Sequence, residues 1–190
     1  MATTASAPSR TGNRPGGRSA RVRAAVHRAI QELLADEPNE PPTIPVVAAR
    51  AGVHPTTVYR RWGCVADLLA DVATSRFTGD IVVPDTGSLR GDLERYADDL
   101  ARDLCDPDTL NLVRATIGIG GEQGAAACRG EREQQLEAIL EREQERGGQP
   151  PTLERTTDAI LAPLYYRAVF TNFRLTSEWA HGLVAHLLDA

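Results

Sequence analysis

The chain has 190 residues, enough for one large or two small domains, and its formal net charge of −5 argues, as a total, against a nucleic-acid-binding protein. The charge is unevenly distributed, because residues 1–62 carry nine arginines against four carboxylates, whereas residues 63–190 carry twelve arginines against 22 carboxylates. A basic N-terminal third followed by an acidic remainder is typical of a nucleic-acid-reading unit joined to a part with another role.

The first 36 residues predict an arm followed by a helix. Residues 1–19 are rich in Ala, Ser, Pro, Gly and Arg without apolar periodicity, so we expect a disordered basic arm. This arm is either a solvated tail or a segment that touches nucleic-acid phosphates. Residues 21–36 repeat apolar side chains every three or four positions, which predicts an amphipathic helix, and the Pro-rich segment 37–42 ends it.

Residues 43–62 predict two short helices across a tight turn. Thr43 stands ahead of the first helix, residues 44–51, as a candidate cap. Gly52 ends that helix because glycine readily adopts the left-handed conformation. Pro55 opens the second helix, since proline is well tolerated in a first helical turn. The apolar residues expected where the two helices cross are Val47, Ala48, Ala51, Val53 and Val58.

The second of these helices carries a polar face with two fixed positive charges. That face consists of Thr56, Thr57, Tyr59, Arg60 and Arg61. Such a helix fits the major groove of DNA with its N-terminal residues at base edges. The alternative interpretation is an ordinary helical hairpin whose arginines are solvated.

The segment Ala-Ala-Arg-Ala-Gly-Val-His-Pro-Thr-Thr-Val-Tyr-Arg-Arg-Trp at 48–62, with Ala-Asp-Leu-Leu at 66–69, resembles the DNA-binding domain of the tetracycline-repressor (TetR-like) family. The resemblance implies an all-α homodimeric transcriptional regulator, in most cases a repressor. An N-terminal three-helix domain with a helix-turn-helix binds DNA, and a C-terminal helical domain binds a ligand and dimerises. The domains implied are a basic arm at 1–19, the DNA-binding domain at 20–66 and the effector-binding and dimerisation domain at 67–190.

The resemblance implies DNA contacts from the turn and the second helix. The predicted DNA-binding residues are Thr43, Pro55, Thr56, Thr57, Tyr59, Arg60 and Arg61. The chain departs from the family pattern just afterwards. Gly63, Cys64 and Val65 stand where the family usually has a cap and a lysine, so no cation lies at this end and the resemblance does not extend to the family's phosphate contact there.

The rest of the chain predicts helices at residues 67–77, 88–103, 109–119, 125–146, 153–170 and 176–188. Glycines between 118 and 124 are expected to break the chain between the third and fourth of these. The fourth is highly charged and is expected to be an exposed outer helix. Pro163 predicts a kink in the fifth helix, and Ser88 and Thr176 are candidate caps.

The resemblance also implies a small, largely apolar effector and a four-helix dimer interface built from the last two helices. The candidate ligand-binding residues are Phe77, Tyr96, Leu100, Leu112, Thr116, Tyr166 and Phe170. The candidate interface residues are Leu164, Tyr165, Trp179, Leu183, Val184 and Leu187. The alternative for the last two helices is a hairpin within one chain.

Other chemistry finds little support in the sequence. His181 and His186 are five residues apart and so lie on different helical faces, and no catalytic motif stands out, so no metal, cofactor or enzymatic activity is expected. Cys64, Cys105 and Cys128 are odd in number and widely spaced, which favours a cytoplasmic protein with buried packing thiols. No apolar run reaches the roughly 18 residues of a membrane span. The rival function is a helical protein-interaction module without a DNA role.

Overall fold

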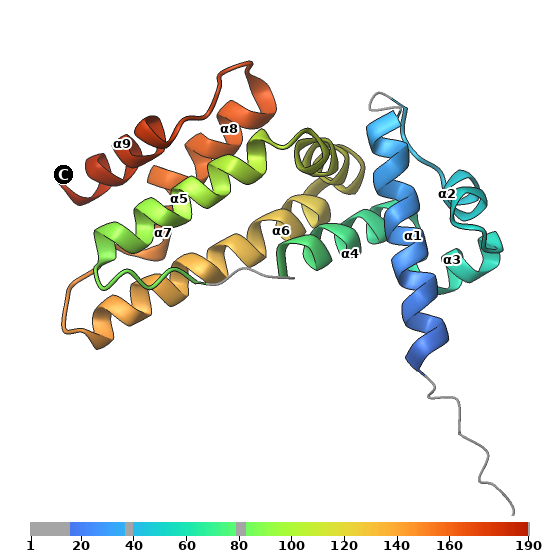
Figure 1. Cartoon of the computed structure of the whole chain (residues 1–190), viewed down its shortest axis with the longest axis horizontal. Helices are drawn as coiled ribbons and strands as arrows, with labels where there is room; N and C mark the ends of the chain where they lie inside the picture. The colour runs from blue at the N-terminus through green and yellow to red at the C-terminus, as the bar shows by residue number, and fades with distance from the viewer. Residues whose placement is uncertain (1–15, 37–39, 79–82, 190) are drawn as a thin grey trace, which may run out of the picture.

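The computed structural model describes residues 16–36, 40–78 and 83–189, and every regular element in these ranges is helical (Figure 1). The elements are α1 Gly16–Asp36, α2 Ile44–Ala51, α3 Pro55–Trp62, α4 Val65–Thr78, α5 Leu89–Cys105, α6 Pro107–Glu145, α7 Leu153–Thr156, the π turn η1 Thr157–Leu161, α8 Ala162–Phe170 and α9 Ser177–Leu188. The predicted all-α fold is confirmed.

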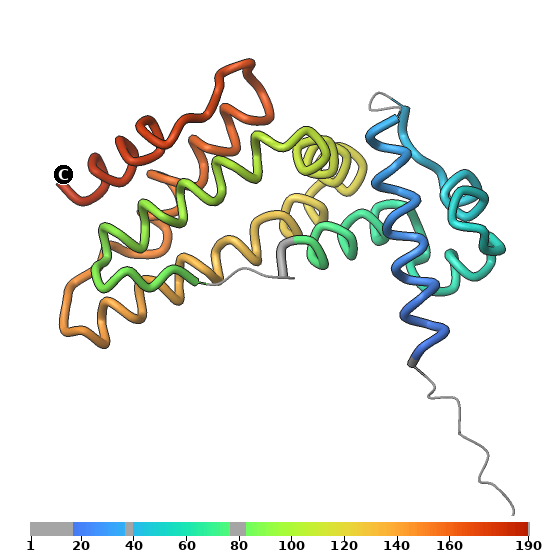
Figure 2. The backbone as a smooth tube through the Cα atoms, in the orientation of Figure 1, coloured from blue at the N-terminus to red at the C-terminus, as the bar shows by residue number. Residues whose placement is uncertain are grey.

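The helices form two parts along the long axis of the molecule. Helices α1, α2 and α3 lie together at one end, and α4 leads from α3 towards the centre (Figure 1). Helices α5, α8 and α9 occupy the other end, so the C-terminus lies far from α3 (Figure 2). Helix α6 reaches from the centre to that far end and contacts α1 and α4 as well as α5.

Helix α1 begins more than one turn earlier than the predicted start at residue 21. No proline interrupts residues 17–36. The Arg21 guanidinium also donates a hydrogen bond from Nε to the Gly17 carbonyl at 3.0 Å, which supports this extra turn. The last residues of the predicted arm are therefore helical, and residues 1–15 lie outside the described residues. The predicted apolar stripe is buried, with Val26 and Ile30 both fully inaccessible to solvent.

Two hydrophobic cores share helix α4. Leu68, Leu69 and Val72 pack into the N-terminal core with α1, α2 and α3. Ala73, the next residue, belongs to the C-terminal core. The N-terminal unit therefore includes the first half of α4, whereas the sequence placed its end at residue 66.

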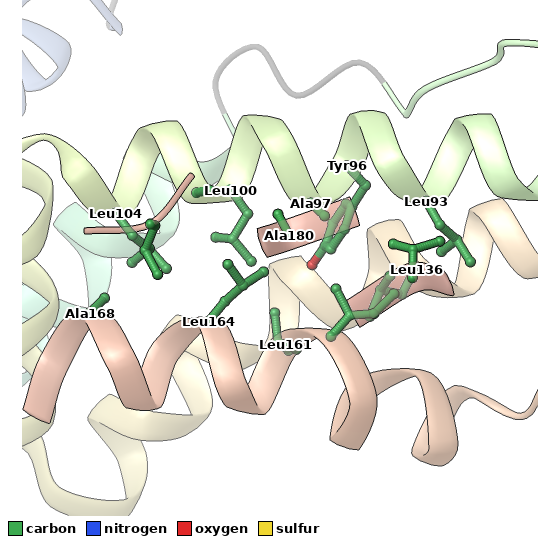
Figure 3. Close-up of a cluster of buried hydrophobic side chains, with 14 of the residues drawn as sticks. Leu93, Tyr96, Ala97, Leu100, Leu104, Leu136, Leu161, Leu164, Ala168 and Ala180 are labelled. Carbon is green, nitrogen blue, oxygen red and sulfur yellow. The ribbon is translucent and has the colours of Figure 1, made fainter. Parts of the chain in front are cut away.

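The C-terminal core lies where α5 faces η1 and α8. Figure 3 shows Tyr96, Leu100 and Leu104 of α5 pointing towards Leu161 and Leu164. Side chains from α6 and α9 close the same cluster. This dense contact positions α8 within the subunit.

Helix α6 confirms the predicted glycine break but not the predicted exposure. Gly121 has φ 53° and ψ −133°, a conformation outside the helical region that L-residues rarely adopt, so the helix changes direction there. Beyond the break, Leu136 and Ile139 are fully buried, which corrects the expectation of an exposed outer helix. Arg132 is also buried, and its Nη2 donates to Asp103 Oδ2 at 2.7 Å, so its charge is paired across to α5.

The remaining local predictions have mixed outcomes. Ser88 and Thr176 cap α5 and α9 as predicted, accepting hydrogen bonds from backbone N–H groups of the first turn. A widened turn, η1, precedes Pro163 in place of the predicted simple kink. In this turn the Ala162 N–H donates to the Thr157 carbonyl, five residues earlier. The expectation of packing thiols holds only for Cys128, since the other two cysteines are exposed.

Candidate DNA-binding site

The turn between α2 and α3 is fixed by small residues and by a left-handed glycine. Gly52 has φ 67° and ψ 32°, and its N–H donates to the Ala49 carbonyl at 3.2 Å, as a helix C-cap requires. Val47, Ala48 and Val58 are fully buried where the two helices cross. The predicted helix-turn-helix is therefore present, and α3 is held on α2 with its opposite face in solvent.

The N-terminus of α3 has a cap that the sequence did not indicate. His54 stands ahead of Pro55, and its Nδ1 accepts from the Thr56 N–H at 3.3 Å and lies 3.0 Å from Thr56 Oγ1. The exposed Thr56 hydroxyl is therefore already oriented by the cap. Imidazole is an unusual N-cap, since Ser, Thr, Asp and Asn are preferred, which explains why the pattern did not reveal it.

A basic groove of about 730 Å³ runs between the first turns of α1 and the exposed face of α3. Its lining residues are Arg18, Ser19, Val22, Val53, His54, Thr57, Arg60 and Arg61. Three of them are arginines and none is a carboxylate, so the groove attracts anions. The sequence predicted the contribution of α3 to this groove but placed Arg18 and Ser19 in the unstructured arm.

Three of the predicted DNA-binding residues, Thr57, Arg60 and Arg61, line this groove. Arg61 Nη1 donates to Ser19 Oγ at 2.9 Å, and its guanidinium carbon lies 5.2 Å from the centre of the Trp62 ring. Tyr59 is 49 % exposed. Thr43 occupies the N-cap position of α2 without a side-chain capping bond, so its exposed hydroxyl is available to a ligand.

One carboxylate behind the groove joins α1, α3 and α4. Asp71 accepts from Arg23 through Nη2 at 2.7 Å and Nε at 3.1 Å, and from Trp62 Nε1 at 2.8 Å. His27 Nε2 lies 2.8 Å from the same carboxylate. Sequence analysis missed this cluster, because its members are separated by up to 48 positions and only the tertiary fold brings them together.

The charges of this cluster are set by burial and hydrogen bonding. Burial raises the pKa of Asp71, but the hydrogen bonds from Arg23, Trp62 and His27 outweigh it and lower that pKa to about 2. Burial lowers the pKa of His27 below 6.5 by more than the neighbouring Asp71 raises it. At neutral pH a neutral His27 therefore donates Nε2–H to an ionised Asp71, and this bond joins α1 to α4 beside Trp62 of α3.

The structure does not bring the candidate ligand-binding residues together. Tyr96 and Leu100 are buried in the C-terminal core, whereas Leu112 packs into the N-terminal core. Thr116 is buried and bonds the Leu112 carbonyl of its own helix at 2.7 Å. Tyr166 and Phe170 are instead 62 % and 73 % exposed, and only the backbone of Phe77 is described.

The candidate interface residues divide between core and surface. Leu164, Val184 and Leu187 are buried inside the subunit, so these three are corrected to positions in the intrachain core. Tyr165, Trp179 and Leu183 are only partly buried. The most exposed aromatic rings of α8 are those of Tyr166 and Phe170, which the sequence analysis had placed in a ligand pocket.

Comparison with known proteins decides the family. Residues 83–187, more than half of the chain, match the family described as "Tetracyclin repressor-like, C-terminal domain". The chain is also 31 % identical over 157 residues to the HTH-type transcriptional regulator AqdR of Rhodococcus erythropolis, with 83 % of this chain and 76 % of AqdR covered.

The chain belongs to the TetR family of transcriptional regulators.

Other relatives agree with this TetR assignment. The uncharacterized HTH-type transcriptional regulator YdeS of Bacillus subtilis (strain 168) is 28 % identical over 168 residues, covering 84 % of both chains. Among solved structures, the TetR family transcription regulator SCO0332 superposes with a TM-score of 0.69 at 25 % identity, covering 89 % of this chain and 97 % of that one. A TetR regulator from Agrobacterium tumefaciens shares the fold, with a TM-score of 0.68 at 21 % identity, covering 89 % and 93 % of the two chains.

TetR membership assigns the helix-turn-helix its role. The protein is a DNA-binding transcriptional regulator, which decides against the rival of a helical interaction module without a DNA role. In the parts of the chain that the structure describes, no helix combines the length and apolar character of a membrane span.

Proposed function

We propose that this regulator is a homodimeric repressor whose two α3 helices enter successive major grooves of a pseudo-palindromic operator. The observation that carries the proposal is the basic groove beside α3, where Arg18, Arg60 and Arg61 converge without an opposing carboxylate among the lining residues. Arginine suits both phosphate oxygens and the major-groove edge of guanine. Such a protein acts where the chromosome lies, so we place it in the cytoplasm and assign it no catalytic role.

The proposed contacts divide into two kinds. Thr57 lies in the groove close to the N-terminus of α3 and is assigned to base edges. Arg61 lines the groove, and its hydrogen bond to Ser19 holds it against α1. Because its position is fixed in this way, Arg61 is assigned to a phosphate. Tyr59 and Thr43 are exposed and are assigned to the DNA backbone.

The second copy of the chain is proposed to dock on the exposed face of α8. Tyr166 and Phe170 lie one helical turn apart, with ring centroids separated by 5.6 Å. Phe173 follows in the connection to α9 at 43 % exposure, and its ring stacks at 4.0 Å under the Arg167 guanidinium. Exposed aromatic rings of this kind are typical of protein interfaces and need a partner surface.

The experiment that tests the proposal begins with selection of bound genomic fragments, which supplies the operator. Gel shifts then compare Thr57→Ala and Arg61→Ala on operator and on random DNA. Loss of a base contact should cost about 1–3 kcal/mol on the operator alone, whereas loss of a phosphate contact should weaken both DNAs alike and reduce the salt dependence. Arg28→Ala is the matched control, because Arg28 is exposed on α1 outside the groove and pairs with Glu32. Equal binding by all three variants and wild type would remove these assignments.

We further propose that a small molecule releases the repressor from its operator. The support is the family assignment and the division of the molecule into two cores joined through α4 and α6. A ligand shifts a two-state equilibrium from 99:1 to 1:99 with roughly 5.5 kcal/mol of differential affinity. Titration of operator-bound protein with candidate effectors tests this step.

A further inference from the structure

A serine hydroxyl lies in the basic groove beside α3. Helix α1 lines this groove with Arg18, Ser19 and Val22, and only Ser19 of these three carries a hydroxyl. Ser19 is exposed, and its Oγ accepts a hydrogen bond from Arg61 Nη1 at 2.9 Å. The hydroxyl is therefore in contact with the guanidinium that the proposed function assigns to a DNA phosphate.

The arginines around this hydroxyl keep their positive charge uncompensated. Elsewhere on α1 the charge is paired, as in Arg23, whose Nη2 lies 2.7 Å from the Asp71 carboxylate. Among the described residues, no carboxylate pairs with Arg18, Arg60 or Arg61. An anion in the groove therefore meets guanidinium groups that are free to form charge-assisted hydrogen bonds with it.

A phosphate group on Ser19 fits the chemistry of this groove. Phosphoserine carries about −1.5 to −2 charges at pH 7 and three acceptor oxygens, and opposite an arginine cluster it forms new charge-assisted hydrogen bonds. Because Ser19 Oγ already lies 2.9 Å from Arg61 Nη1, phosphate oxygens attached to it begin within reach of that guanidinium. The groove has a volume of about 730 Å³, so the added group requires no rearrangement of buried side chains.

The segment that carries Ser19 is accessible to an enzyme. Its sequence is Arg-Ser-Ala-Arg-Val-Arg at 18–23, and arginines on both sides of the serine suit a kinase with an acidic substrate cleft. Residues 17–20 are all exposed. The ends of helices open locally at little cost in free energy, so the first turn of α1 can unwind into such a cleft.

We propose that Ser19 is a phosphorylation site and that its phosphate occupies the basic groove in place of a DNA phosphate. In the modification, Ser19 Oγ attacks the γ-phosphorus of ATP. The new O–P bond forms as the bond from the γ-phosphorus to the β,γ-bridging oxygen breaks, ADP leaves, and the hydroxyl proton passes to the catalytic base of the kinase. The effect on DNA binding rests on the proposed function, whereas the phosphorylation site itself does not.

The expected loss of operator affinity follows from the charge of the phosphate. Phosphoserine compensates about two of the three arginine charges in the groove, so about two DNA phosphate contacts are lost. Each such contact contributes about 0.9 to the slope of log affinity against log salt concentration. Phosphorylation should therefore reduce this slope by roughly 1.8 and lower operator affinity about 60-fold at about 0.1 M salt.

The site test incubates the full chain with γ-labelled ATP and a cell extract of the source organism, and locates the label by tandem mass spectrometry. Wild type should be labelled at Ser19, Ser19→Ala should lose that label, and saturating operator DNA should protect Ser19 because it covers the groove. A wild-type protein that carries no label at Ser19 overturns the phosphorylation site.

The DNA-binding test compares full-length protein carrying phosphoserine at position 19 with the unmodified protein, by gel shift on the operator at several salt concentrations. Phosphatase treatment should restore the affinity of the unmodified protein. Ser19→Asp and Ser19→Asn have side chains of nearly equal size, so their comparison isolates one charge. Ser19→Asp should bind operator about eightfold more weakly than Ser19→Asn at about 0.1 M salt. Ser177→Asp, which adds the same charge at an exposed position of α9, should bind as wild type does.

Two further readouts separate the possible failures. Thermal unfolding of the phosphorylated protein should occur at no lower temperature than that of the unmodified protein, so loss of DNA binding by unfolding is recognised. Equal operator affinity and equal salt dependence with and without the phosphate overturn the proposed effect on DNA binding. Equal operator binding by unmodified wild type and Arg61→Ala refutes instead the groove contacts of the proposed function, so the two failures are distinct.

Discussion

The carboxylate of Asp71 joins α1, α3 and α4, and Asp71→Asn measures how strongly this junction holds the helix-turn-helix. The pKa of the carboxyl falls from 3.8 to about 2 in the folded protein. At about 1.36 kcal/mol for each pKa unit, the ionised group contributes roughly 2 kcal/mol to the free energy of unfolding at neutral pH. The side chain is 29 % exposed, so solvent screens it only in part.

The pH dependence of the free energy of unfolding shows whether ionisation of Asp71 stabilises the folded protein. A carboxyl whose pKa is lowered on folding stabilises the protein above its unfolded pKa, here 3.8, and the contribution is lost as the pH falls towards 2. The difference in unfolding free energy between wild type and Asp71→Asn should therefore be about 2 kcal/mol at pH 7 and close to zero at pH 2.

Urea unfolding followed by circular dichroism measures this difference at each pH. Asp67→Asn is the control, because it removes a carboxylate one turn earlier on α4 without removing the contacts of Asp71, and it should cost less than about 1 kcal/mol. A difference for Asp71→Asn that does not change between pH 7 and pH 2 would refute the reasoning, since it would show that packing rather than ionisation is responsible.

Further predictions follow from other local features. Because burial lowers the pKa of His27, wild type should lose stability as the pH falls below 6.5, and urea unfolding of His27→Gln should show a flatter profile from pH 7 to 5. Gly121→Ala should cost about 1–3 kcal/mol in thermal or urea unfolding because of its positive φ, whereas Gly118→Ala, with open space around its Cβ, should be neutral or stabilising. Light scattering should show Phe170→Ser as a monomer of nearly unchanged stability, whereas Leu164→Ala should lose about 2–5 kcal/mol of stability.

The helix-turn-helix could be predicted from the sequence because its determinants are local. A glycine that ends one helix, a proline that opens the next and a small residue at their crossing lie within a dozen positions, and the structure places Gly52, Pro55 and Ala48 in these roles. Family resemblance covered the same stretch. Local rules of this kind need no knowledge of the tertiary fold.

Burial of charge could not be predicted, because it depends on partners that are distant in sequence. The charged run of α6 predicted an exposed helix, yet Arg132 is buried since Asp103 on α5 neutralises it at 2.7 Å. Asp71 is a similar case, because its partners come from two other helices. A helical wheel shows which residues share a face, but it does not show which face meets an opposite charge.

The buried and exposed faces of α8 differ from those that the family resemblance implied. Leu164, a candidate interface residue, is buried in the intrachain core, whereas Tyr166 and Phe170, expected in a ligand pocket, are exposed. A resemblance identifies the helix, but it does not show how the helix is rotated about its axis in this chain. That rotation depends on η1 at Thr157–Leu161, a π turn that the sequence analysis did not predict.

The first half of α6 packs against both ends of the molecule, so we expect the proposed effector response to pass through it. Leu112 and Val113 are neighbours in sequence, yet the first packs in the N-terminal core and the second in the C-terminal core. A packed interior resists small deformations, so this half of the helix moves as a unit with both sets of neighbours or not at all. The bend lies instead at Gly121, where the backbone leaves the helical conformation. A ligand bound in the C-terminal part would therefore act on α3 through a rigid displacement of α1 and α4. A substitution that restores a straight helix at Gly121 should preserve effector binding and operator binding but abolish the effect of the effector on operator affinity.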